Sequence, residues 1–171
     1  PRYQLGIVND QLGAKISFEP GFESNFSGMF GMNKLDNNWI ITGELNLQME
    51  NYFKSAERGE FFWRRIDSLS QTIKMGAMLP HPFGWRTGVD LKYQHEIFRG
   101  LYASTENRYV LSTYFPLIGT AGFGYVTGKT TPTQLGKENG YEKTSYHAFS
   151  LFSKKENVND RYLPTSGKIL E

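Results

Sequence analysis

The segment WIITGELNLQMENYF, residues 39–53, decides the fold class of this chain. Its odd positions are mostly apolar, from Trp39 to Met49, and its even positions are mostly polar, from Thr42 to Glu50. Successive side chains of a β-strand point to opposite faces, whereas a helix would scatter these Leu and Glu residues around its circumference. The segment therefore predicts a strand with one dry face and one wet face.

The same alternation recurs along the rest of the chain. Aromatic residues make up 15% of the sequence and Gly occurs 18 times, which is typical of strands joined by tight turns. The pattern predicts an all-β, antiparallel up-and-down fold. The further predicted strands are residues 3–8, 12–19, 26–32, 69–79, 85–95, 108–115, 121–128 and 145–154.

Length and composition narrow the class of protein. A chain of 171 residues without a low-complexity linker predicts one domain, residues 1–171. A net charge of +2 implies no strong field for nucleic acid. The absence of Cys excludes disulfides, and no apolar run approaches the roughly 20 residues of a membrane-spanning helix. The start at Pro1, without Met, suggests a mature or truncated product.

The predicted connections alternate in length. PHPFG (80–84), PLIGT (116–120) and LPTSG (163–167) are short and rich in Pro and Gly, whereas residues 54–60, 98–107 and 129–143 are predicted to form longer polar loops. Outer-membrane barrels have this asymmetry, with short periplasmic turns and long external loops.

Three features favour a transmembrane barrel. Charged residues lie at mid-strand on the wet face and suit a polar lumen: Glu44, Lys74, Asp90 and Lys92. Aromatic residues lie at predicted strand ends, where aromatic girdles form: Trp39, Phe53, Trp85, Tyr114 and Phe115. Several strands reach the roughly 9–11 residues that cross a bilayer. A small self-closed barrel, acting as a pore or structural protein, and a soluble ligand-binding barrel remain as alternatives.

Residues for catalysis, cofactor binding or metal binding do not form a recognisable pattern. The three histidines, His81, His95 and His147, are far apart and lack the spacing of a metal site. The acidic residues are dispersed, and no serine lies in a G-x-S-x-G motif. We expect no enzymatic activity, no catalytic residues, no cofactor and no metal.

Two further motifs have a simpler interpretation. GYVTGKTT, residues 124–131, lacks the first glycine of a phosphate-binding loop, because position 123 is Phe123. We also expect no helix after Pro132. The Arg-rich segment SAERGEFFWRRIDS, residues 55–68, is predicted to be a solvated loop with an aromatic border rather than a nucleic-acid or lipopolysaccharide patch.

The C-terminal stretch NDRYLPTSGKILE, residues 159–171, resembles a turn of the bacterial surface-antigen barrels. These form the outer-membrane assembly and translocation superfamily that includes BamA- and TamA-type proteins. Their periplasmic turn has the pattern D-x₃₋₅-P-T-x-G and is followed at once by a strand. The matching residues are Asp160, Arg161, Pro164, Thr165 and Gly167. Residues 113–128, TYFPLIGTAGFGYVTG, resemble the hairpin that precedes this turn in the family.

The resemblance implies that the chain is the N-terminal half of a larger barrel. The family has a 16-stranded barrel preceded by periplasmic POTRA modules, whereas we expect about eight or nine strands here. The POTRA modules are not expected in this chain. Neither is the C-terminal half, whose external loop carries a V/I-R-G-F/Y motif. Unpaired strand edges in lipid are costly, so the chain would need either further strands or closure on itself as a small barrel.

The function implied by the resemblance is insertion or export of client proteins at a lateral gate. The first and last strands of such barrels can part, and a client strand then pairs with the exposed edge. The first strand would be residues 3–8 or the segment carrying Leu12, Ala14, Ile16 and Phe18. The expected partners are outer-membrane lipids, unfolded or nascent outer-membrane proteins and accessory lipoproteins, with no nucleic acid. The expected location is the bacterial outer membrane.

Overall fold

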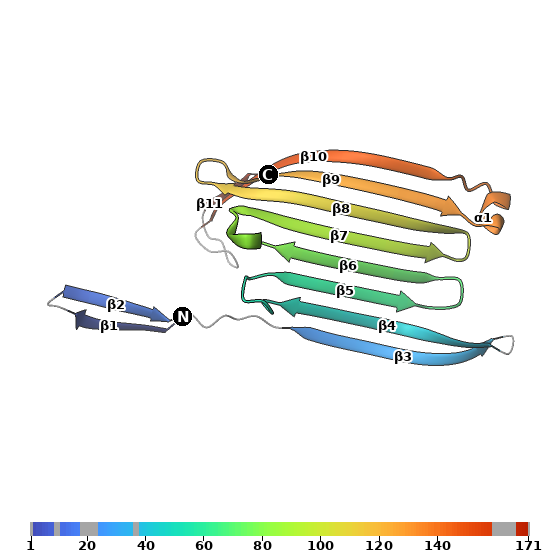
Figure 1. Cartoon of the computed structure of the whole chain (residues 1–171), viewed down its shortest axis with the longest axis horizontal. Coiled ribbons are helices and arrows are strands. Elements are labelled where there is room, and N and C mark those ends of the chain that lie inside the picture. Colours follow the sequence, from blue (N-terminus) through green and yellow to red (C-terminus); the bar gives the residue numbers. More distant parts are fainter. Residues whose placement is uncertain (1, 9–10, 18–23, 36–37, 159–166, 171) are drawn as a thin grey trace.

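The computed structural model describes residues 2–8, 11–17, 24–35, 38–158 and 167–170. Within them the chain is almost entirely β-structure (Figure 1). The strands are β1 (Arg2–Val8), β2 (Gln11–Ser17), β3 (Asn25–Leu35), β4 (Asn38–Glu50), β5 (Arg58–Arg65), β6 (Gln71–Leu79), β7 (Thr87–Phe98), β8 (Tyr102–Phe115), β9 (Gly119–Pro132), β10 (Thr144–Val158) and β11 (Gly167–Leu170). A 3-10 turn, η1 (Pro82–Gly84), and a short helix, α1 (Gln134–Glu138), complete the described elements.

Strands β3 to β10 form one antiparallel sheet in which each strand pairs with its neighbours in sequence. Strand β11 extends this sheet by pairing with the last four residues of β10. Strands β1 and β2 form a separate two-stranded hairpin, which lies apart from the large sheet in Figure 1. The predicted all-β, antiparallel up-and-down arrangement is therefore confirmed.

The large sheet is open rather than closed into a barrel. Among the described residues, β3 pairs only with β4, and the outer side of β10 pairs only with β11. The sheet thus has two edges, β3 at one side and β10 with β11 at the other. The strand number exceeds the expected eight or nine, because two strands lie in the hairpin and nine in the sheet.

Strand β5 corrects the prediction of a solvated loop in this region. Residues 58–65 pair with β4 on one side and β6 on the other. The alternation of apolar and polar residues in β5 is interrupted, because Phe62 lies on the same face of the sheet as the charged residues Arg64 and Lys74. The two cationic groups lie 5.2 and 5.9 Å from its ring centroid. An aromatic ring shielded by cations can occupy a polar face, which sequence periodicity does not reveal.

The segment before the predicted strand 108–115 is also strand, since β8 begins at Tyr102. Its first half carries small and polar residues on both faces, from Ser104 to Asn107, so no apolar alternation marks it. The predicted loop 98–107 shrinks to the short connection 99–101. Strand β4, in contrast, stops at Glu50 before the predicted end at Phe53, because Asn51 has a φ of +54°.

The connection between β9 and β10 contains a helix, which contradicts the expectation of none after Pro132. Helix α1 begins after Thr133, whose hydroxyl accepts a hydrogen bond from the Gly136 amide at 3.1 Å. The phosphate-loop interpretation still fails. Gly128, Lys129 and Thr130 lie within β9 and pair on both sides.

The predicted division into short turns at one end and long loops at the other is wrong. Because β5 is a strand, the loop 51–57 lies at the same end as the turns 80–86 and 116–118. We call this end B. The opposite end, end A, holds the connections 66–70, 99–101 and 133–143. Each end therefore mixes short and longer connections.

Candidate functional site: the two faces of the sheet

Strand register separates the side chains of the sheet into two chemically distinct faces. Residues paired across an antiparallel sheet point to the same side. Leu45 pairs with Gly28 and Trp63, and Trp63 pairs with Ile73. Following the register from strand to strand assigns every position of β3 to β10 to an apolar face or a polar face.

The apolar face carries large hydrophobic residues on every strand from β3 to β10 and is not covered. No large hydrophobic side chain among the described residues is buried, and Phe30, Phe149 and Leu151 are 60%, 70% and 85% exposed. Representative members are Phe26, Phe30, Met32, Trp39, Ile41, Leu45, Leu47, Met49, Phe61, Trp63, Ile73, Met75, Leu79, Val89, Leu91, Tyr109, Leu111, Phe123, Tyr125, Phe149 and Leu151. We call this set the apolar belt.

The apolar belt is slanted relative to the strands. On β3 the belt residues are centred at the position of Met29. Strand pairing places this position level with Thr144 on β10. The belt on β10 is instead centred near Ser150, closer to end B. With about 3.3 Å per residue and about 4.8 Å between strands, this shift corresponds to a slant of roughly 30°. Strands of transmembrane barrels are tilted by a similar amount, about 35–45°.

The charges on the apolar face are all positive in the described strands β3 to β10. They are Lys34, Arg65, Lys129 and Lys155, and each lies toward a strand end, at or beyond the margin of the apolar belt. Long cationic side chains at such margins can extend toward phosphate-bearing headgroups.

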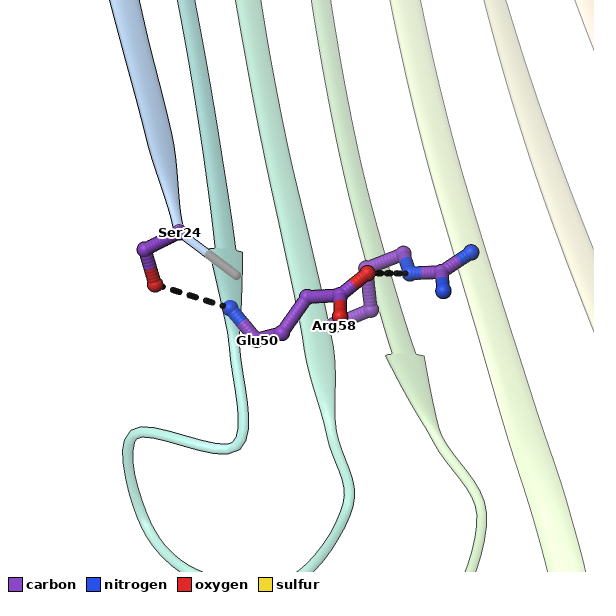
Figure 2. A network of polar contacts seen from close by, with 3 residues as sticks. All are labelled: Ser24, Glu50 and Arg58. Carbon is purple, nitrogen blue, oxygen red and sulfur yellow. Dashed lines mark hydrogen bonds and ion pairs between the residues drawn. The ribbon is translucent and has the colours of Figure 1, made fainter. Parts of the chain in front are cut away.

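The polar face carries balanced charge. Among the side chains that the structure describes in β3 to β10, six acidic and six basic residues lie on it: Glu44, Glu50, Glu60, Asp90, Glu96, Glu106, Arg58, Arg64, Lys74, Lys92, Arg108 and Lys154. Several are paired across strands. Arg64 Nε lies 2.7 Å from Glu44 Oε2, and Arg58 Nε lies 2.8 Å from Glu50 Oε1 (Figure 2). The backbone amide of Glu50 also donates to Ser24 Oγ at 3.3 Å (Figure 2). The predicted mid-strand charges Glu44, Lys74, Asp90 and Lys92 all lie on this face.

Glycines of β9 create space on the polar face for side chains of β10. A Cβ atom at Gly128 would lie 2.2 Å from the Tyr146 ring, and one at Gly122 would lie 2.5 Å from the Phe152 ring. Tyr146 therefore lies across β9, and its hydroxyl donates to Glu106 Oε2 of β8 at 2.5 Å. The side chains of Tyr146 and Phe152 therefore lie close to the β9 backbone on the polar face.

The loop 51–57 at end B is organised around one carboxylate. Glu57 is the only buried polar or charged side chain among the described residues, at 8% exposure. Its carboxylate accepts hydrogen bonds from the Ser55 hydroxyl at 2.6 Å, the Ser55 amide at 3.0 Å and the Phe53 amide. The hydrogen bond from the Ser55 side chain is the largest of the effects that lower the pKa of Glu57 from 4.5 to about 2. These hydrogen bonds hold the loop around the Glu57 carboxylate, and the side chains of Tyr52 and Phe53 are largely exposed.

The predicted aromatic residues at strand ends gather mainly at end B. Phe53 and Trp85 lie in end-B connections, and Phe115 lies at the end of β8 on the apolar face. Trp39 lies at end A, in the second position of β4. Tyr114 differs from the expectation of a girdle, because it pairs with Thr120 on the polar face.

The predicted family-turn residues lie largely outside the described part of the chain. Asp160, Arg161, Pro164 and Thr165 are not described, and Gly167 is the first residue of β11. In the predicted gate segment, Leu12, Ala14 and Ile16 belong to β2, which pairs with β1 rather than with the large sheet. Phe18 is outside the described residues.

The histidines lie at three separate places in the fold. His81 Nδ1 is 3.3 Å from the Trp85 carbonyl, His95 Nδ1 is 2.9 Å from Thr105 Oγ1, and His147 Nδ1 is 2.7 Å from the Tyr125 hydroxyl. Within the described ranges, no group of three or more His, Asp or Glu residues could hold a metal ion. No helix there is long and apolar enough to cross a membrane.

Comparisons with protein-family models, curated proteins and solved structures found no match for this chain.

Proposed function

We propose that the chain is part of an outer-membrane β-barrel, with its apolar face toward lipid and its polar face toward the lumen. The uncovered apolar belt carries this proposal. A soluble antiparallel sheet buries its apolar face against a second layer. No described element covers the belt, and hydrocarbon is the environment that suits such a surface.

The slant and the flanking charges of the belt add support. A barrel closes only if its strands tilt, and a lipid-facing band then crosses successive strands at a shifted position. The belt shifts steadily toward end B in this way, and the face that carries it holds only cations at its margins. A randomly exposed surface would have no reason to combine these two features.

Within this class, we assign the chain to assembly or translocation of client proteins. The open sheet supports this assignment, because its edges carry unpaired backbone groups that a client strand could use. The family resemblance of the segment 159–167 is the second support. Further strands of the same protein would complete the barrel, and the backbone rather than catalytic side chains would act on the client.

The membrane proposal is tested by the depth of individual tryptophans. The chain has three, and Trp63 lies within the belt on β5, whereas Trp85 lies in an end-B turn. Variants retaining one of them are reconstituted in vesicles with brominated lipids. We expect Trp63 to be quenched most by bromine near the bilayer centre and Trp85 by bromine near the headgroups. A soluble barrel would leave both unquenched.

The client proposal needs a separate test with the full-length protein. Vesicles that contain it should accelerate insertion of a denatured outer-membrane protein, relative to empty vesicles. Ion conductance without such acceleration would instead support a passive pore.

A further inference from the structure

We infer that the β1–β2 hairpin docks on the free edge of β3 and extends the membrane-embedded sheet by two strands. This inference rests on the proposed membrane location. The hairpin pairs with no described strand of the large sheet, and β3 has no described partner on its outer side. An isolated two-stranded hairpin is marginally stable in water, and an open sheet edge is unfavourable in lipid. Docking would satisfy the backbone groups of both.

The sequence of the hairpin matches the pattern of the sheet. The register of β1 with β2 pairs apolar residues with apolar residues, as in Leu5 with Ala14 and Ile7 with Leu12. The alternate pairs are mostly polar, as in Gln4 with Lys15. The hairpin therefore has the same division into apolar and polar positions as β3 to β10.

The connection between β2 and β3 is too short for a parallel crossover, so the two strands would pair antiparallel. Residues 18–24 separate the strands and include Pro20 and Gly21, which favour turns. The hydrogen bond between Ser24 and the Glu50 amide positions the start of β3 beside β4 (Figure 2). The register that we propose has Ile16 opposite Phe26 and Leu12 opposite Phe30, so that apolar positions coincide.

One consequence concerns the edge of the sheet. With the hairpin docked, β2 becomes an interior strand and β1 becomes the outermost one. The edge open to another strand would then be that of β1, not that of β3.

Disulfide trapping tests the inference, because the chain contains no native Cys. In the predicted register Lys15 is opposite Ser27, and directly paired positions are close enough for a disulfide. The full chain carrying Lys15→Cys with Ser27→Cys is placed in vesicles and oxidised. We expect efficient intramolecular cross-linking, seen as a mobility change that a reductant reverses.

Two matched variants check the register. Ala14→Cys with Ser27→Cys places the thiols on opposite faces, and Lys15→Cys with Met29→Cys tests a shift of two residues. We expect the first to cross-link poorly. Efficient cross-linking of the second alone would retain the docking and correct the register. Equal cross-linking of all three pairs, or intermolecular products only, would overturn the inference.

Trp63 quenching is measured in the same vesicles. Quenching without cross-linking would overturn the docking and leave the membrane proposal intact. Absence of Trp63 quenching would contradict the membrane proposal and, with it, the docking that depends on it.

Discussion

Gly43, near the β3 edge of the sheet, has a backbone conformation and surroundings that favour glycine. Its φ is +151°, and a Cβ there would lie 2.2 Å from the Met29 carbonyl oxygen of β3. That contact is with backbone, so a side chain cannot be accommodated by a rotamer change. Gly43 allows β3 to approach β4 at this point.

Gly43→Ala should therefore destabilise the pairing of β3 with β4. We expect the free energy of unfolding to fall by about 1–3 kcal/mol, the usual cost of a strained backbone position. Urea unfolding in detergent micelles, followed by tryptophan fluorescence, measures the change. Gly59→Ala on the adjacent strand is the control, because its Cβ would make only an ordinary contact of 3.7 Å with Met49. Equal losses in both variants would contradict the explanation.

The lowered pKa of Glu57 predicts that the stability of the loop 51–57 depends on pH. Its pKa is lowered from 4.5 to about 2 in the folded chain, so the ionised form is the one that stabilises the loop. This stabilisation is complete above the ordinary pKa and is lost as the pH falls toward 2. Glu57→Gln should flatten the decline in stability between about pH 5 and pH 2.

Urea unfolding at successive pH values measures this effect. The exposed carboxyl of Glu142, in the connection between β9 and β10, provides the control Glu142→Gln. If both Gln variants decline with pH as steeply as the unmodified chain, the hydrogen bonds to Glu57 do not contribute as described.

At the scale of the element, β6 offers a direct comparison of the two faces. Met75 and Met78 are on the same strand and are similarly exposed, at 46% and 39%. Met75 pairs with Phe61 and Tyr93 on the apolar face, whereas Met78 pairs with Arg58 and Asp90 on the polar face. Burial alone therefore does not distinguish them, and only their surroundings differ.

A lysine substitution at each position should show which face of β6 contacts lipid and which contacts water. Met75→Lys should destabilise the chain in bilayers by about 2–4 kcal/mol, the cost of Lys near the bilayer midplane, and Met78→Lys by much less. Reversible unfolding from vesicles measures both. Similar small effects would indicate that the apolar face contacts water.

The elements also show what periodicity can predict. Strands β4, β6 and β7 follow from alternation, because the belt crosses the middle of each. Strand β5 is not recognisable from alternation, because the aromatic residue Phe62 occupies a position on the polar face. The first half of β8 lies beyond the slanted belt, so both of its faces are polar and the chain resembles a loop there. Helix α1 is a single short element held by Thr133, below the length at which a helical period can be recognised.

At the scale of the molecule, sequence predicts two faces but not whether the sheet closes. Closure depends on the pairing of distant strands, which alternation along one strand does not encode. The placement of β1 and β2 apart from β3 is likewise invisible in the pattern, since all three strands alternate in a similar way.

The open edge of β10 gives a measurable consequence. Residues 144–153 pair with β9 on one side, and no strand that the structure describes pairs with them on the other. Their outward amides should exchange with solvent deuterium faster than those of β7, which pairs on both sides. Hydrogen exchange of the chain in micelles measures the difference. Uniform protection of β10 would show that this edge is occupied.

The charge balance of the polar face has an implication for any pore that this wall lines. The six carboxylates and six cationic groups that the structure describes on this face are interspersed and partly paired, so they cancel over short distances. Strong ion selectivity requires a ring or stripe of one sign, and the described side chains of these eight strands form none. Their share of a channel wall would favour neither anions nor cations, and any sorting of permeating solutes would depend on width rather than charge.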